Sequence, residues 1–153
     1  MQFPEGFVEK YEAILEDEAR DFLASFKQEA VSAFRVNPLK ESQLSFADAI
    51  PHTPWGHYGK VSGKSPEHVT GFVYSQEPAA QMVAQVAQPS PGMKVLDLAA
   101  APGGKSTQLA AYLANQGVLV SNEISSKRAK ILVENMERFG ATNVVVINES
   151  ADR

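Results

Sequence analysis

Hydrophobic and polar residues follow two different patterns along this chain. Near the start, apolar residues recur three and four positions apart over 3–15 and again over 19–26, the spacing of one helix face. The acidic residues between them are expected on the solvated faces of these two helices. The stretch A-V-S-A-F-R-V-N, residues 30–37, predicts a strand that ends before a proline. Further helices are expected over 42–50 and from Pro78 onward.

From residue 93, strand and helix patterns alternate with short loops. Strands are predicted over 94–98, 118–122 and 143–148, and helices over 105–115 and from Ser125 or Ser126 to Phe139. The last strand is continuous and β-branched, as buried parallel strands are. We therefore expect the α/β fold class: the first three strands of a doubly wound parallel sheet, preceded by a small α+β domain. The turn Q-P-S-P-G predicts domains at 1–88 and 89–153.

The composition is that of an ordinary globular protein, with 44% hydrophobic and 21% charged residues. A formal net charge of -4 gives no overall basic field, which weakens an RNA partner without excluding one. The absence of cysteine excludes disulfides, thiolate zinc sites and a cysteine nucleophile within this chain. The three histidines form no metal-like cluster in the sequence, so no metal is expected. Without a long apolar run or a signal peptide, we expect a cytoplasmic location and no membrane contact.

The most informative stretch is D-L-A-A-A-P-G-G-K-S-T, residues 97–107, directly after the strand predicted at 94–98. It nearly matches two nucleotide-binding patterns. The chain lacks the first glycine of the P-loop pattern, because Ala99 stands at that position. Of the three glycines in the dinucleotide pattern G-x-G-x-x-G, it has only Gly104. Glycines let the backbone approach a ligand, and the following helix offers free N–H groups to a carboxylate or phosphate.

A second candidate is Glu123, at the end of the strand predicted at 118–122. In nucleotide-binding sheets an acid at this place accepts hydrogen bonds from both ribose hydroxyls, and Glu123 lies 18 residues after Lys105, near the usual spacing of about 20. The third strand ends in Asn148, where a P-loop enzyme needs an aspartate to hold magnesium. A nucleoside that carries an amino-acid carboxylate and no phosphate tail is therefore favoured, which describes S-adenosylmethionine.

These residues also carry a family resemblance. The stretches V-L-D-L-A-A-A-P-G-G-K-S-T and N-E-I-S-S-K-R resemble the RNA (cytosine-5) methyltransferases of the Sun family, and F-R-V-N-P-L-K and G-F-V-Y-S-Q-E-P-A-A look like their preceding motifs. The likeness is nearest to bacterial enzymes of 16S ribosomal RNA. It implies a Rossmann-like fold, S-adenosyl-L-methionine as cofactor, 16S ribosomal RNA as partner and 5-methylcytosine as product. The cofactor-binding residues it implies are Ala99, Ala100, Ala101, Pro102, Gly103, Gly104, Lys105, Glu123 and Arg128.

The resemblance further implies that segment 76–78 lies near the site, and that an aspartate near Ser150 would face the adenine, where Glu149 or Asp152 could substitute. The family attacks cytosine with one cysteine and releases the product with another, yet this chain has none. We therefore expect an N-terminal fragment that contains no catalytic residue and is inactive alone, the C-terminal half of its cofactor domain being missing.

Other interpretations remain open at this stage. The chain could be a non-catalytic RNA-binding module with a vestigial cofactor loop. A P-loop-like NTPase is less favoured, because Ala99 replaces the first glycine of that pattern. The aromatic segment P-H-T-P-W-G-H-Y-G-K, residues 51–60, could stack on RNA or pack the small domain onto the sheet. Arg35 and Asn37 could be structural or could face the substrate.

Overall fold

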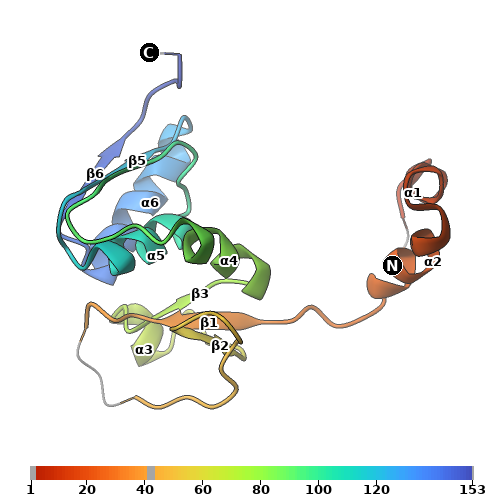
Figure 1. The fold of residues 1–153 in the computed structure, drawn as a ribbon, viewed down its shortest axis with the longest axis horizontal. Helices are drawn as coiled ribbons and strands as arrows, with labels where there is room; N and C mark the ends of the chain where they lie inside the picture. Colours follow the sequence, from red (N-terminus) through yellow and green to blue (C-terminus); the bar gives the residue numbers. More distant parts are fainter. Residues whose placement is uncertain (1–2, 41–43, 153) are drawn as a thin grey trace. The chain divides into compact units, whose positions relative to one another are not determined.

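The computed structural model describes residues 3–40 and 44–152, and the chain divides into two compact units, residues 1–30 and 31–153. The first unit is a helical hairpin: α1 (Phe7–Leu15), the 3-10 turn η1 (Glu16–Glu18) and α2 (Ala19–Ser25) (Figure 1). Aromatic rings pack against one another along the hairpin, with neighbouring centroids 4.6 to 5.7 Å apart: Phe3, Phe7, Tyr11, Phe22 and Phe26. The helices predicted over 3–15 and 19–26 are confirmed in the described part.

The second unit begins with a small antiparallel sheet of strand order β2-β1-β3. Its elements are β1 (Ala33–Val36), β2 (Gly56–Tyr58), α3 (Pro66–Val69) and β3 (Val73–Ser75). The helix predicted over 42–50 is wrong for 44–50, and residues 42 and 43 lie outside the described residues. The backbone there pairs with β2 instead: Ile50 N donates to Gly56 O, and Tyr58 N donates to Asp48 O.

The rest of this unit alternates helices and strands as expected. Its elements are α4 (Pro78–Ala87), β4 (Lys94–Asp97), α5 (Gly104–Leu113), β5 (Val118–Asn122), α6 (Ser126–Phe139) and β6 (Val144–Ile147). The strands are parallel in the order β4-β5-β6, with Val95 opposite Leu119 and Leu119 opposite Val144. The predicted α/β fold is confirmed. The contacts divide the chain at 30/31, so the domain boundary at 88/89 stays a prediction.

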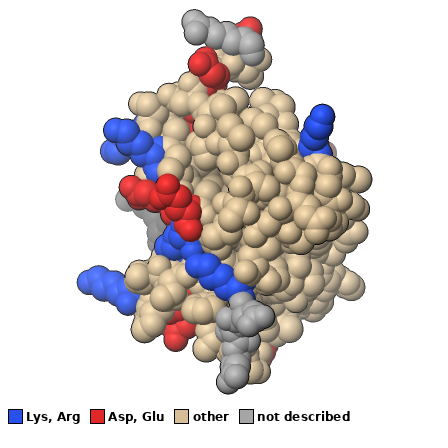
Figure 2. Space-filling model, turned by 90° about the vertical axis from the view of Figure 1, so that its left-hand side faces the viewer, with Lys and Arg blue, Asp and Glu red and all other residues tan. Residues whose placement is uncertain are grey.

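Among the described residues, helices cover one face of the parallel sheet and leave the other face exposed. The core between α4, α5, α6 and the sheet contains Leu113, Leu119 and Leu132, each with 0% of its surface exposed. On the opposite side, apolar residues of all three strands are exposed: Leu96 (58%), Val118 (40%) and Val145 (50%). Figure 2 shows the side of the molecule on which β5 and β6 lie in Figure 1. Most of its charged side chains lie toward the left of that view, and much of the remaining surface is uncharged. Parallel sheets are normally covered on both faces.

Polar side chains just after β1 join the small sheet to α6. Asn37 is buried, and its Nδ2 donates to the carbonyls of Gly71 (2.8 Å) and Phe139 (2.6 Å). Lys40 Nζ donates to Arg138 O (2.8 Å), at the helix end where cations are favoured. At Gly71, with φ at +73°, an added Cβ would lie 1.9 Å from Arg138 O, so only glycine fits. These contacts fix the small sheet against the parallel sheet.

Two absences apply to the described part of the chain. No helix within it is both long and apolar enough to cross a membrane. Nor does any group of three His, Asp or Glu residues there have the arrangement of a metal site.

Candidate ligand-binding site

The loop between β4 and α5 is held by the aspartate that ends β4. Asp97 Oδ2 accepts a hydrogen bond from Ser106 Oγ (2.7 Å), and Oδ1 accepts one from Ala99 N (3.3 Å). The carboxylate therefore fastens the first turn of α5 to the strand end. Gly103 has φ at +114°, and a Cβ there would approach Leu132 Cδ1 to 3.2 Å, so this position requires glycine.

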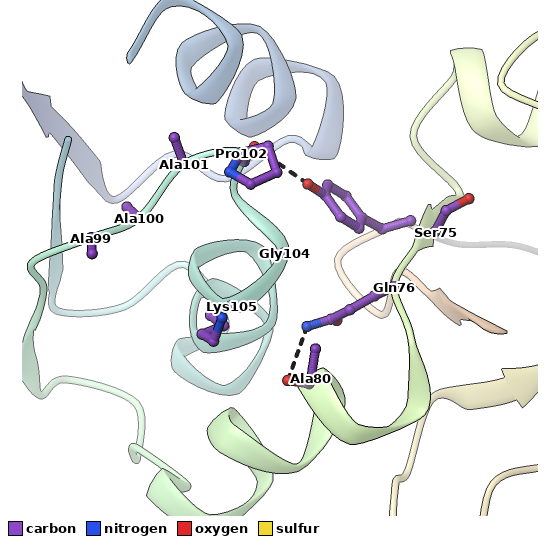
Figure 3. Close-up of a pocket in the computed structure, with 10 residues that line it drawn as sticks. Ser75, Gln76, Ala80, Ala99, Ala100, Ala101, Pro102, Gly104 and Lys105 are labelled. Carbon is purple, nitrogen blue, oxygen red and sulfur yellow. Dashed lines mark hydrogen bonds between the residues drawn. The ribbon is translucent and has the colours of Figure 1, made fainter. Parts of the chain in front are cut away.

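A cavity of about 200 Å³ lies between this loop, the end of β3 and the start of α4 (Figure 3). Its lining residues are Tyr74, Ser75, Gln76, Ala80, Ala99, Ala100, Ala101, Pro102, Gly104 and Lys105. Small-molecule pockets usually measure roughly 300–1,000 Å³, so this cavity has room for only part of a cofactor-sized ligand. Segment 76–78, expected near the site, contributes Gln76 to the wall.

The start of α5 gives the cavity an anion-binding character. The first N–H groups of a helix have no acceptor within the helix and lie at its positive end. Here the first intrahelical bond is donated by Thr107 N to Gly103 O (2.8 Å), which leaves the amides of Gly104, Lys105 and Ser106 ahead of it. The exposed side chain of Lys105 adds positive charge beside the cavity. A carboxylate suits this arrangement.

Glu123 and Arg128 meet the same loop from the other side. Glu123 is 2% exposed; its Oε1 accepts from Ser125 N (2.9 Å), and its Oε2 lies 3.4 Å from Arg128 Nη1. Arg128 Nη2 donates to Ala101 O (2.5 Å). Arg128 thus ties the loop to Glu123. Neither residue lines the cavity, and Gly103 does not line it either, so the candidate residues form two adjoining parts that meet at Ala101.

Two asparagines that the sequence did not single out as site residues hold the strand ends together. Asn122 Nδ2 donates to Leu98 O (3.2 Å) and Glu149 O (3.0 Å), bridging the ends of β4 and β6. Asn148 Nδ2 donates to the carbonyls of Glu123 (2.5 Å) and Ile124 (2.9 Å). The sequence feature that could have identified both residues is an asparagine at the end of a predicted strand. Asn148, which had argued against a magnesium site, fixes the backbone that carries Glu123.

The aromatic segment after residue 51 mainly packs inside the unit. The Trp55 ring lies 4.8 Å from that of Tyr112 on α5, and the His57 ring lies 5.6 Å from Phe34. The interpretation that this segment packs the small sheet onto the larger one is confirmed for Trp55. Tyr58, which is 42% exposed, keeps a ring open to solvent.

Comparison with known proteins agrees with this arrangement. Residues 3–78 match the family described as the N-terminal domain of 16S rRNA methyltransferase RsmF, and residues 84–153 match 16S rRNA methyltransferase RsmB/F. The chain belongs to this 16S rRNA methyltransferase family. The ribosomal RNA small subunit methyltransferase F of Vibrio campbellii is 37% identical over 165 residues, covering 95% of this chain and 34% of the relative. The chain therefore spans about a third of that relative's length.

Solved structures confirm the fold. A methyltransferase homolog protein from Pyrococcus horikoshii matches with a TM-score of 0.82 and 27% identity, over 97% of this chain and 53% of that one. The NSun6 structure from Pyrococcus horikoshii, titled as a complex with SFG, matches with a TM-score of 0.85 and 18% identity, over 97% and 66%. The Rossmann-like methyltransferase architecture expected from the sequence is thus present.

Proposed function

We propose that this chain is the cofactor-binding part of an S-adenosyl-L-methionine-dependent methyltransferase that forms 5-methylcytosine in 16S ribosomal RNA in the cytoplasm. The observation that carries the proposal is the A-A-A-P-G-G-K loop, held by Asp97 below it and Arg128 beside it. The family match supports the same reading. Residues 89–153 would form half of the cofactor domain, and residues 1–88 a domain that contacts RNA.

The cofactor would lie along the loop. When bound, it supplies the methyl group from its sulfonium. The methionine portion would occupy the cavity along Ala99–Gly104, with its carboxylate against the free amides of α5 and the Lys105 amine. Glu123 would accept hydrogen bonds from the ribose, and Arg128 would orient Glu123 and the loop. Glu123 Oε1 already accepts a hydrogen bond from Ser125 N. The ribose hydroxyls would therefore share Oε2 with Arg128, which lies beside it.

The chain alone would carry out no methyl transfer. Attack on carbon 6 of cytosine needs a thiolate, and the sequence contains no cysteine. We propose that the catalytic cysteines belong to a further segment that completes the domain. The bare face of the sheet, with Leu96, Val118 and Val145 exposed, supports such a covering segment. Cofactor affinity of the isolated chain would be poor, because the 200 Å³ cavity encloses only part of the ligand.

The distribution of charge is compatible with RNA as the partner. Residues 1–30 contain eight of the 18 acidic residues but only three of the 14 lysines and arginines. The negative net charge therefore comes from residues 1–30, whereas acidic and basic residues nearly cancel over residues 31–153. A local basic surface on the second unit is thus not opposed by a strong negative field.

The proposal is tested by titrating the ¹⁵N-labelled chain with S-adenosylhomocysteine and following its amide resonances. Amides of residues 99–101, 103–105 and 123–128 should shift with weak affinity, while those of the hairpin 7–25 should not. Mg²⁺-ATP is the control ligand for the NTPase alternative and should leave the loop unchanged. Shifts with ATP but none with S-adenosylhomocysteine would overturn the assignment.

Methyl transfer is tested separately, with radiolabelled S-adenosylmethionine and 16S ribosomal RNA. The isolated chain should label no RNA above background. Label at cytosine produced by the chain alone would contradict the proposed need for a further segment.

A further inference from the structure

Arg35 is a buried cation without an acidic partner among the described residues. It lies on β1, the middle strand of the small sheet, and is 0% exposed. Its guanidinium carbon lies 5.5 Å from the Tyr74 ring centroid and 5.8 Å from that of Phe139. Burial lowers the pKa of the guanidinium from its ordinary value to about 9, which leaves it charged at neutral pH. Burying an arginine without a carboxylate is costly, so its neutral contacts need an explanation.

The guanidinium bonds to both walls of the cavity. Its Nε donates to Gln76 Oε1 (2.5 Å), and Gln76 in turn donates to Ala80 O (3.1 Å) on α4. Its Nη2 donates to Gly104 O (2.9 Å) and to Thr107 Oγ1 (2.7 Å) on α5. Thr107 Oγ1 lies 2.8 Å from Gly103 O, to which it donates. One side chain thus holds two consecutive carbonyls of the loop.

Holding these carbonyls fixes the direction of two amides. In a trans peptide the carbonyl and the following N–H point in opposite directions. The carbonyl of Gly103 therefore sets the direction of the Gly104 amide, and the carbonyl of Gly104 sets that of Lys105. Both carbonyls are held on the Arg35 side, so both amides point away from it, and Gly104 and Lys105 line the cavity.

We infer that Arg35 is a positioning residue that, from the small sheet, aims the free amides of α5 at the ligand carboxylate and fixes the opposite wall through Gln76. The identity of the ligand rests on the proposed function, but the aiming of the amides does not. Arg35 places its guanidinium where no substrate reaches it, so it acts through the loop rather than by contact. It makes the shape of the cofactor site depend on the domain proposed to contact RNA.

The inference is tested without any ligand, by amide hydrogen exchange in the 153-residue chain. Arg35→Met removes the donors and the charge while keeping a long apolar side chain. The amide of Thr107, which bonds to Gly103 O, should then exchange about tenfold faster, the effect of losing a hydrogen bond to a charged group. Arg35→Lys, which replaces the planar fork by a point charge, should raise the same rate by a smaller factor.

Asn37→Ala is the matched control, because Asn37 belongs to the same segment but bonds to the end of α6. Measured against the slowest-exchanging amides, which report the loss of global stability, it should accelerate exchange of the Gly140 amide and leave Thr107 within about twofold of the parent. The inference is overturned if Thr107 stays within about twofold in both Arg35 variants. It is equally overturned if all amides accelerate together, since Arg35 would then support only general stability.

The two proposals fail in different ways. If Thr107 exchange rises as expected but S-adenosylhomocysteine produces no shift in the parent chain, the cofactor assignment is wrong and the positioning role of Arg35 stands. If the cofactor shifts the loop equally in the parent and Arg35→Lys, with unchanged exchange, the positioning role is wrong and the cofactor assignment stands.

Discussion

Replacing Asn37 by alanine should destabilise the protein more than any exposed asparagine does. The substitution removes three hydrogen bonds: to Gly71 O (2.8 Å), to Phe139 O (2.6 Å) and from Leu39 N (2.9 Å). Asn37 is 1% exposed, so water cannot replace the lost partners. At roughly 1 kcal/mol for each group left unpaired, the free energy of unfolding should fall by about 2–4 kcal/mol.

Thermal unfolding followed by circular dichroism measures this loss. At roughly 2–4 °C per kcal/mol for a domain of this size, the midpoint should fall by about 5–15 °C. Asn143→Ala is the matched control, because Asn143 Nδ2 donates to a single backbone carbonyl, that of Gln116, in an exposed bond (3.0 Å). The control should lose less than about 1 kcal/mol. Equal losses in the two variants would refute the claim that Asn37 joins the sheets.

Three further predictions concern the site and its surroundings. Glu123→Gln should weaken S-adenosylhomocysteine binding at least about tenfold in the amide titration, since it removes the charge that faces Arg128 and the ribose; unchanged affinity would contradict the ribose role. Gly71→Ala should lower the unfolding free energy by more than about 2 kcal/mol in urea titrations, because its Cβ would meet a carbonyl oxygen, and a neutral result would show that the joint can shift. Tyr58→Ala should weaken RNA binding in a filter assay with little loss of stability, and Trp55→Ala should do the reverse; matching effects would refute the division between exposed and packed rings.

The local patterns were predictable, because they reflect periodicity within a few residues. The alternation from residue 93, the position of the loop after β4 and the end of α6 at Gly140 are confirmed. The helix expected over 42–50 was wrong for 44–50, because pairing with β2 outweighed the local pattern. A local pattern contains no information about which distant strand will compete for the backbone.

The roles of the polar residues depend on contacts between distant parts of the sequence. Arg35 bonds to Gly104 across 69 positions, and Asn37 bonds to Phe139 across 102 positions. Their sequence context is therefore compatible with both a structural and a substrate-facing role. The loop and Glu123 could be named as candidates because residue type and spacing are local, whereas the link through Arg128 emerges only from the fold.

A chimera tests whether this chain supplies the cofactor half of a methyltransferase. In the Vibrio campbellii relative, the segment matched by this chain would be replaced by this chain, and incorporation of methyl from S-adenosylmethionine into 16S ribosomal RNA would be measured by mass spectrometry of cytosine. We predict 5-methylcytosine with the chimera and none with the isolated chain. A chimera carrying Glu123→Ala and Lys105→Ala should lose the product. Full activity of that double variant would show that the loop and Glu123 do not hold the cofactor.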